Sequence, residues 1–345
     1  MGIRTAFRLT DAARRLPGPP PLSIASPWAD TSHLDPILWA DLGLPLPLTR
    51  TEAMMVPAMA KARANLCPTI ARFPLRVYAQ AALVTPQPGW CQRTDGPTSP
   101  FHRMLWTVDD LLFYGWSLWA AERGADGQPL QFARVPMDRW GFDEDGQVID
   151  EDGQPVPEAQ AVLIPGPNEG VLYFGAPAIR HASDLLAASS QAAATPAANT
   201  ELHQTVGALM DPADVDELIG LWAAARRGAN GGVAYTPPNM EVKDHGAFDA
   251  HLLVEGRNAA AVDVARVAGQ PASMVDAVTA SAGLEYNTGE TRNAQFLDYG
   301  LEAYLTAVSA RLSMDDVVPR GQRVAFDLED FLAPVPGTSG AITDD

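Results

Sequence analysis

Two clusters of carboxylates are the side chains in this sequence whose types and spacing could most readily do chemistry. They are Asp143-Glu144-Asp145 and Asp150-Glu151-Asp152. Grouped carboxylates can bind Ca²⁺ or share acid and base roles. Each cluster, however, ends in an Asp-Gly pair, which favours a hairpin turn because glycine accepts a positive φ. The ligand spacing of an EF-hand is also missing. The pattern therefore favours solvated hairpin turns over a calcium site.

The other residue types that carry catalysis or bind cofactors are scattered. No His-Glu-x-x-His pair and no Gly-x-Ser-x-Gly elbow occurs, and these mark zinc and serine hydrolases. The two lysines, Lys61 and Lys243, do not lie in a glycine-rich loop of the kind that holds phosphates. The six histidines are isolated from one another or spaced poorly for one helix face: His33, His102, His181, His203, His245 and His251. We therefore predict no catalytic residues, no metal site and no cofactor.

Composition limits the class of protein further. The chain has 345 residues, of which 47% are hydrophobic, and a net charge of −18. This length suggests about two domains with a sizeable core. The acidic balance argues against a protein that grips nucleic acid through an overall basic surface. Cys67 and Cys91 are the two cysteines, which favours buried thiols in a reducing compartment. No apolar run is long enough to span a membrane, and we predict no membrane partner.

Elements of mixed type follow one another along the first half of the chain. Frequent prolines in residues 1–50 predict an extended arm that packs on another surface. Apolar spacing predicts a helix over 51–72, broken or kinked by proline, and a second helix over 101–123. Tryptophans at helical spacing (Trp106, Trp116, Trp119 and, further on, Trp222) are interpreted as core residues. Alternation and turn signals predict strands at 73–78, 130–135, 140–149, 162–164 and 171–174.

The second half is mostly helical and contains one long loop. The best-marked helix runs from Asp211, which can cap its start, to Gly228, which can end it. Residues 270–289 form a loop with no clear periodicity, and loops of this length in compact proteins are commonly functional. Further helices are predicted at 179–194, 247–268 and 292–312, and short strands at 233–235, 240–242 and 324–328. The fold class is α+β.

The order of short motifs resembles that of tailed-bacteriophage portal proteins of the HK97-like siphophage type. Each motif is short, and the specificity lies in their order and spacing over residues 50–330. The segments that carry the resemblance are Asn65 to Tyr78, Asp110 to Leu118, Leu130 to Gly146, Val264 to Met274, and Tyr286 to Glu290 with Gln295-Phe296-Leu297. Trp116 replaces an asparagine that is usual in the second of these.

The resemblance implies a portal fold with wing, stem and clip regions, assembled as a ring. It assigns the arm to 1–50, the wing to 51–176 and 289–330, and the tail to 331–345. It assigns the two stem helices to 177–200 and 246–268, the clip to 201–245 and a tunnel loop to 269–288. Little sequence follows Leu328, so we expect a short or absent crown.

The resemblance also implies a function. A portal ring, usually a dodecamer, occupies the unique capsid vertex of the virion and is assembled in the host bacterial cytoplasm. It conducts double-stranded DNA during packaging and ejection, and it contacts the major capsid protein, the terminase large subunit and head–tail connector (adaptor) proteins. Predicted channel residues are Thr279, Ser281, Tyr286 and Asn287, and predicted stem-packing residues are Ala187, Ala188, Leu252 and Ala259.

The distribution of charge is compatible with such a conduit. Residues 246–290 hold two arginines and six acidic residues. Fixed arginines in a channel would bind phosphates through counterion release, whereas a polar or acidic lining lets DNA slide. Two alternatives stay open at this point. One is another ring-forming head–tail connector protein, and the other is a hydrolase or carbohydrate-active enzyme that uses the carboxylate clusters and the tryptophans.

Overall fold

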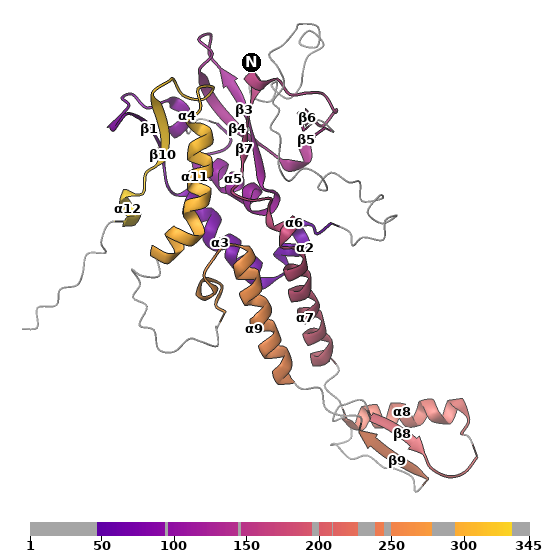
Figure 1. The fold of residues 1–345 in the computed structure, drawn as a ribbon. Helices are drawn as coiled ribbons and strands as arrows, with labels where there is room; N and C mark the ends of the chain where they lie inside the picture. The colour runs from indigo at the N-terminus through magenta and orange to yellow at the C-terminus, as the bar shows by residue number, and fades with distance from the viewer. Residues whose placement is uncertain are drawn as a thin grey trace, which may run out of the picture. The chain divides into compact units, whose positions relative to one another are not determined.

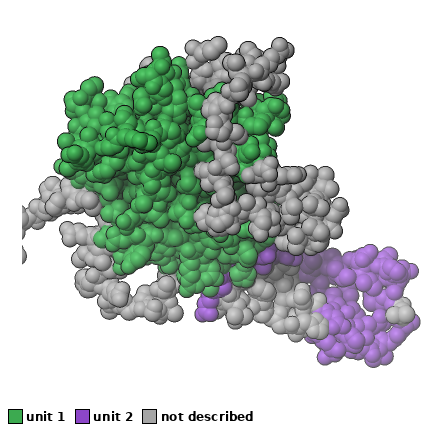
Figure 2. Space-filling model, turned by 45° about the horizontal axis from the view of Figure 1, so that its top comes forward, with its two compact units in different colours: residues 1–182, 259–345 green, residues 183–258 purple. Residues whose placement is uncertain are grey.

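The structure is a computed structural model that describes residues 47–93, 96–143, 146–194, 200–208, 210–226, 239–244, 250–277 and 294–332. It divides into two compact units, drawn in separate colours in Figure 2. Unit 1 holds residues 1–182 and 259–345, and unit 2 holds residues 183–258. The chain enters unit 2 within helix α7 (Ala176–Ala194) and returns within helix α9 (Ala250–Val267). Most of the predicted arm and tail lies outside the described residues.

The predicted proline break near the first helix is confirmed. Helix α2 (Arg50–Met54) starts at a capping box in which Thr49 and Glu52 satisfy each other's backbone N–H groups. Helix α3 (Pro57–Ala71) then begins with proline in its first turn, where no N–H partner is needed. The buried face of α3 packs against helix α5 (Pro100–Tyr114).

The predicted helix over 101–123 is wrong in its second half. Helix α5 ends at Gly115, whose φ of 78° is left-handed, and strand β3 (Trp116–Arg123) follows directly. The tryptophans of this stretch therefore do not form one helical stripe. Trp119 is fully buried, as predicted, but Trp106 is 41% exposed.

A three-stranded antiparallel sheet packs against α5, with strand order β4-β3-β7 (Figure 1). Strand β4 (Pro129–Val135) pairs with one edge of β3, and strand β7 (Ala161–Pro165) pairs with the other. The small β5–β6 hairpin (Trp140–Phe142 and Val148–Asp150) packs its apolar side chains against this sheet.

The Asp-Gly pairs do form the predicted turns, and the structure shows that the three loops share one pattern. The sequence x-x-Asp-Gly-Gln recurs at 124–128, 143–147 and 150–154. In each loop the first residue donates its N–H to the carbonyl of the glutamine, and the glycine N–H donates back to the first residue. Gly127, Gly146 and Gly153 all have φ near 75° (78°, 76° and 72°). This geometry is typical of hairpin loops that end in a left-handed glycine.

The last strand completes a second small sheet, in the order β10-β1-β2. Strand β1 (Leu75–Ala79) pairs with β10 (Gln322–Phe326) along its whole length, with strand β2 (Ala82–Leu83) on its other edge. Helix α11 (Glu302–Leu312) packs against β10 and β7 (Figure 1). The predicted strand at 171–174 is wrong, because Val171–Phe174 forms one helical turn, α6.

Unit 2 is built from a hairpin and a helix. Strands β8 (Thr200–Gln204) and β9 (Met240–Asp244) pair antiparallel, and helix α8 (Pro212–Arg226) lies between them in the chain. The sequence predicted α8 and β9 but not β8, and the predicted strand at 233–235 lies outside the described residues. None of the described helices is long and apolar enough to cross a membrane.

Candidate functional site

The residues predicted to line a channel cannot be placed. Thr279, Ser281, Tyr286 and Asn287 lie in 278–293, outside the described residues. The structure does describe both ends of this segment, so the candidate site is built here from its anchors. The channel role of the four residues stays a prediction.

The first anchor is the end of α9, where the loop begins. Gly269 has a φ of 66°, and its N–H donates to the Arg266 carbonyl at 3.1 Å. The Gln270 N–H donates to the Ala265 carbonyl at 2.9 Å. These two bonds form a Schellman motif, which ends a helix and redirects the chain sharply.

Helix α3 holds the segment that follows this turn. The buried side chain of Gln270 donates from Nε2 to the Ala62 carbonyl at 2.8 Å. Asn65 Nδ2 donates to the Met274 carbonyl at 2.7 Å, in the 3₁₀ turn η5 (Ala272–Val275). Gln270 and Asn65 are thus positioning residues that fix the chain just before it leaves for the loop. Sequence reasoning missed both, because neither residue type marks a buried contact between distant segments.

The second anchor lies where the chain returns. The π-helical turn η6 (Leu297–Leu301) also packs against α3. Phe296 is buried, and a Cβ on Gly300 would lie only 2.9 Å from its ring. A Cβ at position 300 would therefore force the Phe296 ring to move. Both ends of the undescribed loop rest on the same helix, α3.

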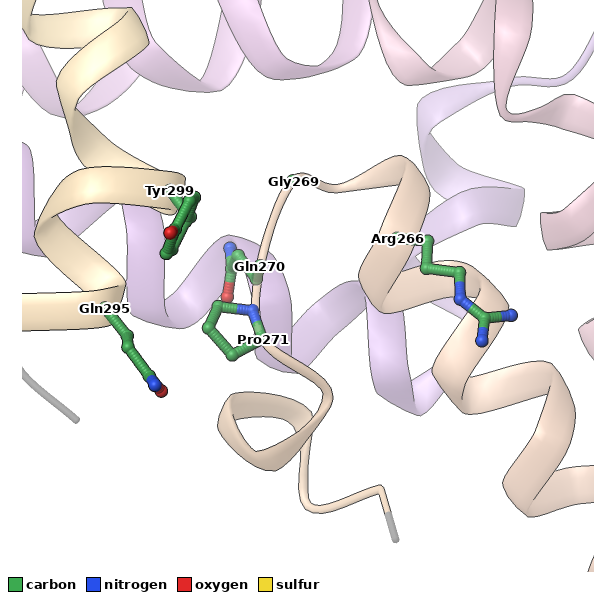
Figure 3. A pocket seen from close by; sticks show the side chains of 6 residues that line it. All are labelled: Arg266, Gly269, Gln270, Pro271, Gln295 and Tyr299. Carbon is green, nitrogen blue, oxygen red and sulfur yellow. The ribbon is translucent and has the colours of Figure 1, made fainter. Parts of the chain in front are cut away.

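A pocket of about 430 Å³ opens between the two anchors (Figure 3). The turn at Gly269-Gln270-Pro271 lies on one side, and Gln295 and Tyr299 lie on the other. Tyr299 is 75% exposed, so the pocket is shallow. Among the described residues, Gln270 Oε1 is buried without a hydrogen-bond partner.

Partly buried ion pairs keep α3 in place. Asp109 on α5 accepts hydrogen bonds from Arg50 at 2.7 and 3.0 Å and from Arg63 of α3 at 2.6 Å. The hydrogen bond to Asp109 raises the pKa of the Arg50 guanidinium above its ordinary value. One carboxylate therefore ties α2 and α3, and through α3 the loop anchors, to the centre of unit 1.

A second buried carboxylate joins α5 to the sheet. Asp110 is 1% exposed and accepts hydrogen bonds from Arg134 Nε at 2.8 Å and Ser117 Oγ at 2.9 Å. Burial raises the pKa of the Asp110 carboxyl, while Arg134 and Ser117 oppose this shift. The partners come from α5, β3 and β4. This cluster is structural, since it is filled by the chain's own side chains.

No group of histidine, cysteine and carboxylate side chains that could hold a metal is found in the described part of the chain. The two thiols are free and buried, as predicted. Burial raises the pKa of Cys91 to about 12, which keeps it protonated and unreactive at neutral pH.

The predicted stem-packing residues are mostly at the surface of the single chain. Ala187, Ala188 and Ala259 are exposed, and the Leu252 side chain lies outside the described residues. The exposed alanines do not pack within the subunit, so their role in packing between subunits stays a prediction.

The anchors allow a direct prediction. Replacing Gln270 with alanine removes the bond to Ala62 and is expected to cost about 1 kcal/mol of local stability. Hydrogen exchange at the Ala277 amide, which bonds to Ala272 in η5, should become several-fold faster. Gln295→Ala on the opposite side of the pocket is the matched control and should leave this exchange unchanged. Equal exchange in both variants would show that Gln270 is not an anchor.

The described elements include two three-stranded sheets, helix α11, and helices α7 and α9, which lead to a separate small unit. This arrangement defines a structural class. A structure of an HK97 family phage portal protein from Corynebacterium diphtheriae matches the chain with a TM-score of 0.70 and 34% identity, over 84% of this chain and 99% of that one. Two structures of the neck of a gene transfer agent particle share the fold at 16% identity. Their TM-scores are 0.58 and 0.59, over 85% and 87% of this chain and 89% and 90% of theirs. No curated protein sequence matches the chain.

The family follows from sequence as well as structure. The family model for phage portal proteins matches residues 62–338. This chain therefore belongs to the phage portal protein family, as the order of its motifs predicted. The match includes both anchors and the whole loop between them.

Proposed function

We propose that this chain is the subunit of the portal ring at the unique capsid vertex, through which double-stranded DNA enters during packaging and leaves during ejection. The observation that carries the proposal is the joint match to the portal family model and to an HK97 family portal structure at 34% identity. The neck of the gene transfer agent was computed with C6 and with C12 symmetry. That symmetry supports a ring for this chain, and a dodecamer is our proposal.

Unit 2 carries the kind of surface that ring neighbours would cover. Ile219 and Leu221 of α8 are 52% and 56% exposed, and Val254 of α9 is 65% exposed. Large aliphatic side chains in such number on a small unit favour contact with another protein surface. A heterologous interface that closes into a ring supplies that surface from the next copy. The exposed alanines of α7 and α9 (Ala187, Ala188 and Ala259) would allow close helix packing between subunits.

The partners follow from the same proposal. The ring would lie in the capsid of the virion, after assembly in the host cytoplasm, and contact the major capsid protein. The ring would also receive the terminase large subunit and then the head–tail adaptor proteins. We propose no catalytic role for the chain, since portal proteins are generally not enzymes.

The two alternatives were a hydrolase and another ring-forming connector protein, and different observations argue against each. The carboxylate clusters that suggested a hydrolase lie in and beside hairpin loops, where Asp143 and Asp150 each accept backbone N–H bonds at 2.7–3.0 Å. This role argues for turn formation. Another ring-forming connector protein would share the ring, but the family model favours the portal over it.

The proposed conduit makes a prediction about the loop 278–293. Ser281→Arg or Tyr286→Arg would place a ring of cations where DNA passes, and each contact to phosphate adds salt-dependent binding. We expect complete capsids with either variant to contain several-fold less nuclease-protected DNA. Ala125→Arg in the exposed β3–β4 loop adds the same charge elsewhere and should leave packaging normal. Normal packaging by all three variants, in rings that assemble, would contradict a low-friction polar lining.

A further inference from the structure

Three neighbouring aromatic rings form an exposed ledge on the first two turns of α5. Phe101 is 39% exposed and Trp106 is 41% exposed. The His102 ring lies between them, 5.3 Å from the Phe101 ring and 5.9 Å from the Trp106 ring. Ser99 Oγ is 2.8 Å from His102 Nδ1 and fixes the orientation of the imidazole. We call Phe101, His102 and Trp106 the aromatic ledge.

The ledge is preformed and has no function in the fold. The hydrogen bond and the ring contacts hold its side chains in place, so little conformational entropy remains to be lost on binding. Clustered aromatic rings at a surface are typical of contact sites for other chain segments. The core beneath is complete without them, because the opposite side of α5 buries Met104, Val108, Leu111 and Leu112.

The N-terminal segment joins the described structure on this same side of α5. Arg50 binds Asp109 and places its guanidinium 5.0 Å from the Phe113 ring centroid. Residues 102, 106, 109 and 113 are spaced by four, three and four positions, so they share one helix face. The chain therefore enters unit 1 on this face of α5. The aromatic ledge lies at the N-terminal end of the same face.

The distance along α5 from Asp109 to the aromatic ledge is short. Along a helix, residues 102 and 109 are about 10 Å apart, at 1.5 Å per residue. An extended chain covers about 3.3 Å per residue. Four to six residues before Arg50 are therefore enough to reach from Asp109 along the ledge. The undescribed chain at this end is 46 residues long and joins the structure at Pro47.

The residues just before Arg50 are of types that can bind exposed aromatic rings. Residues 43–48 read Gly-Leu-Pro-Leu-Pro-Leu. Two prolines separated by leucine favour the polyproline II conformation and disfavour a helix. Such segments bind exposed aromatic side chains because their shape is preformed and their backbone needs no partner strand.

We propose that residues 43–48 dock on the aromatic ledge of their own subunit and hold the N-terminal arm along α5. The ledge is thus an intramolecular binding site for a proline-rich segment. The arm leaves unit 1 from the start of α5, beyond Phe101, instead of from α2. The ion pair between Arg50 and Asp109 determines which residues of the segment lie opposite the rings of the ledge.

Cross-linking of the full chain tests this placement. The native thiols Cys67 and Cys91 are buried, so introduced cysteines can be linked selectively by a short bis-maleimide. Leu44→Cys with His102→Cys should link in high yield. Leu44→Cys with Leu83→Cys, at another exposed site, on β2, is the control and should give several-fold less product.

Mixing ¹⁵N-labelled and unlabelled subunits before assembly shows which chain supplies the arm. Own-chain docking predicts linked peptides that are wholly light or wholly heavy. Mixed peptides would overturn the proposal, because the arm would then come from a second copy. Equal yields from the ledge pair and the control pair would overturn it also.

A second measurement does not depend on cross-linking geometry. Trp106→Ser should increase hydrogen exchange several-fold at the Leu44, Leu46 and Leu48 amides, while Tyr299→Ser, at another exposed aromatic residue, should not. Trp106 is at the surface, so its replacement leaves the core intact. Unchanged exchange in the Trp106 variant would show that the segment does not lie on the ledge.

Discussion

Replacing Gly115 with alanine is expected to lower the free energy of unfolding of unit 1 by about 2–5 kcal/mol. Gly115 has a φ of 78°, which costs a residue with a Cβ about 1–2 kcal/mol. A Cβ there would also lie 2.5 Å from the Glu169 carbonyl carbon and 2.7 Å from the Asn168 oxygen. These are backbone atoms that cannot turn aside, and overpacking of this kind costs about 1–3 kcal/mol more.

Gly127 supplies a control with the same backbone angle. Its φ is also 78°, but a Cβ there would meet no atom within 4 Å. Gly127→Ala should therefore show the conformational cost alone, about 1–2 kcal/mol. Chemical denaturation followed by circular dichroism measures both variants. Equal losses would mean that the close approach at Gly115 contributes nothing.

Gly115 matters because two chain segments come into backbone contact there: the junction between α5 and β3, and the segment that follows β7. The Gly115 carbonyl accepts a 2.7 Å bond from the Gly166 N–H, where β7 ends, and Gly170 approaches the end of α5 with a φ of 90°. Loosening this contact should separate α5 from the turn that leads into α6 and α7. The expected result is a loss of unit 1 stability and, with it, of ring assembly.

Replacing Asp110 with alanine is expected to cost about 3–5 kcal/mol, as in other proteins where one partner of a buried ion pair is removed. Asp110 is 1% exposed, and its loss leaves Arg134 and the buried Ser117 hydroxyl without their partner. The cost arises mainly from the uncompensated arginine, whose side chain is 19% exposed.

Asp315→Ala is the matched control. Asp315 pairs with Arg320 at 2.7 Å, but the two side chains are 59% and 89% exposed. Solvent screens such a pair, so its removal should not measurably shift the denaturation midpoint. Asp110→Asn, which keeps the shape and one acceptor oxygen, should fall between the two. A midpoint for Asp110→Ala equal to that of Asp315→Ala would contradict the structural role of the cluster.

Local signals in the sequence predicted the elements that depend on local chemistry. Proline at position 57, the cap at Asp211 and the Asp-Gly turns each act within a few residues, and each lies where the sequence indicated. The order of short motifs predicted the family for a related reason. The portal fold places its helices and strands in a fixed sequence, and that sequence is visible in the chain.

The errors occurred where tertiary contacts override local pattern. Leu111, Leu112, Trp116 and Trp119 fit a helical stripe, but the backbone contact at Gly115 ends the helix, and the chain pairs with β4 and β7 instead. Val171–Phe174 is apolar enough for a strand, but it has no strand partner among the described residues and forms a turn of helix. Gly115 is nevertheless a local signal for a helix end, and the predicted helix over 101–123 did not take it into account.

For the candidate site, the sequence predicted a loop over 270–289 but not the contacts that the structure shows at its anchors. Its anchors, Asn65 and Gln270, join segments about two hundred residues apart in the chain. A single asparagine or glutamine carries no sign of such a contact, because the same residue types are most often at the surface. The channel and stem assignments depend on neighbouring subunits, which one chain does not contain.

The central claim is that this chain assembles into a portal ring, and electron microscopy of the purified full-length protein with native mass measurement tests it most directly. We expect a closed ring with a central hole and a mass that corresponds to twelve copies of the 36.8 kDa chain. A monodisperse compact monomer, under conditions where the protein is folded, would contradict the account.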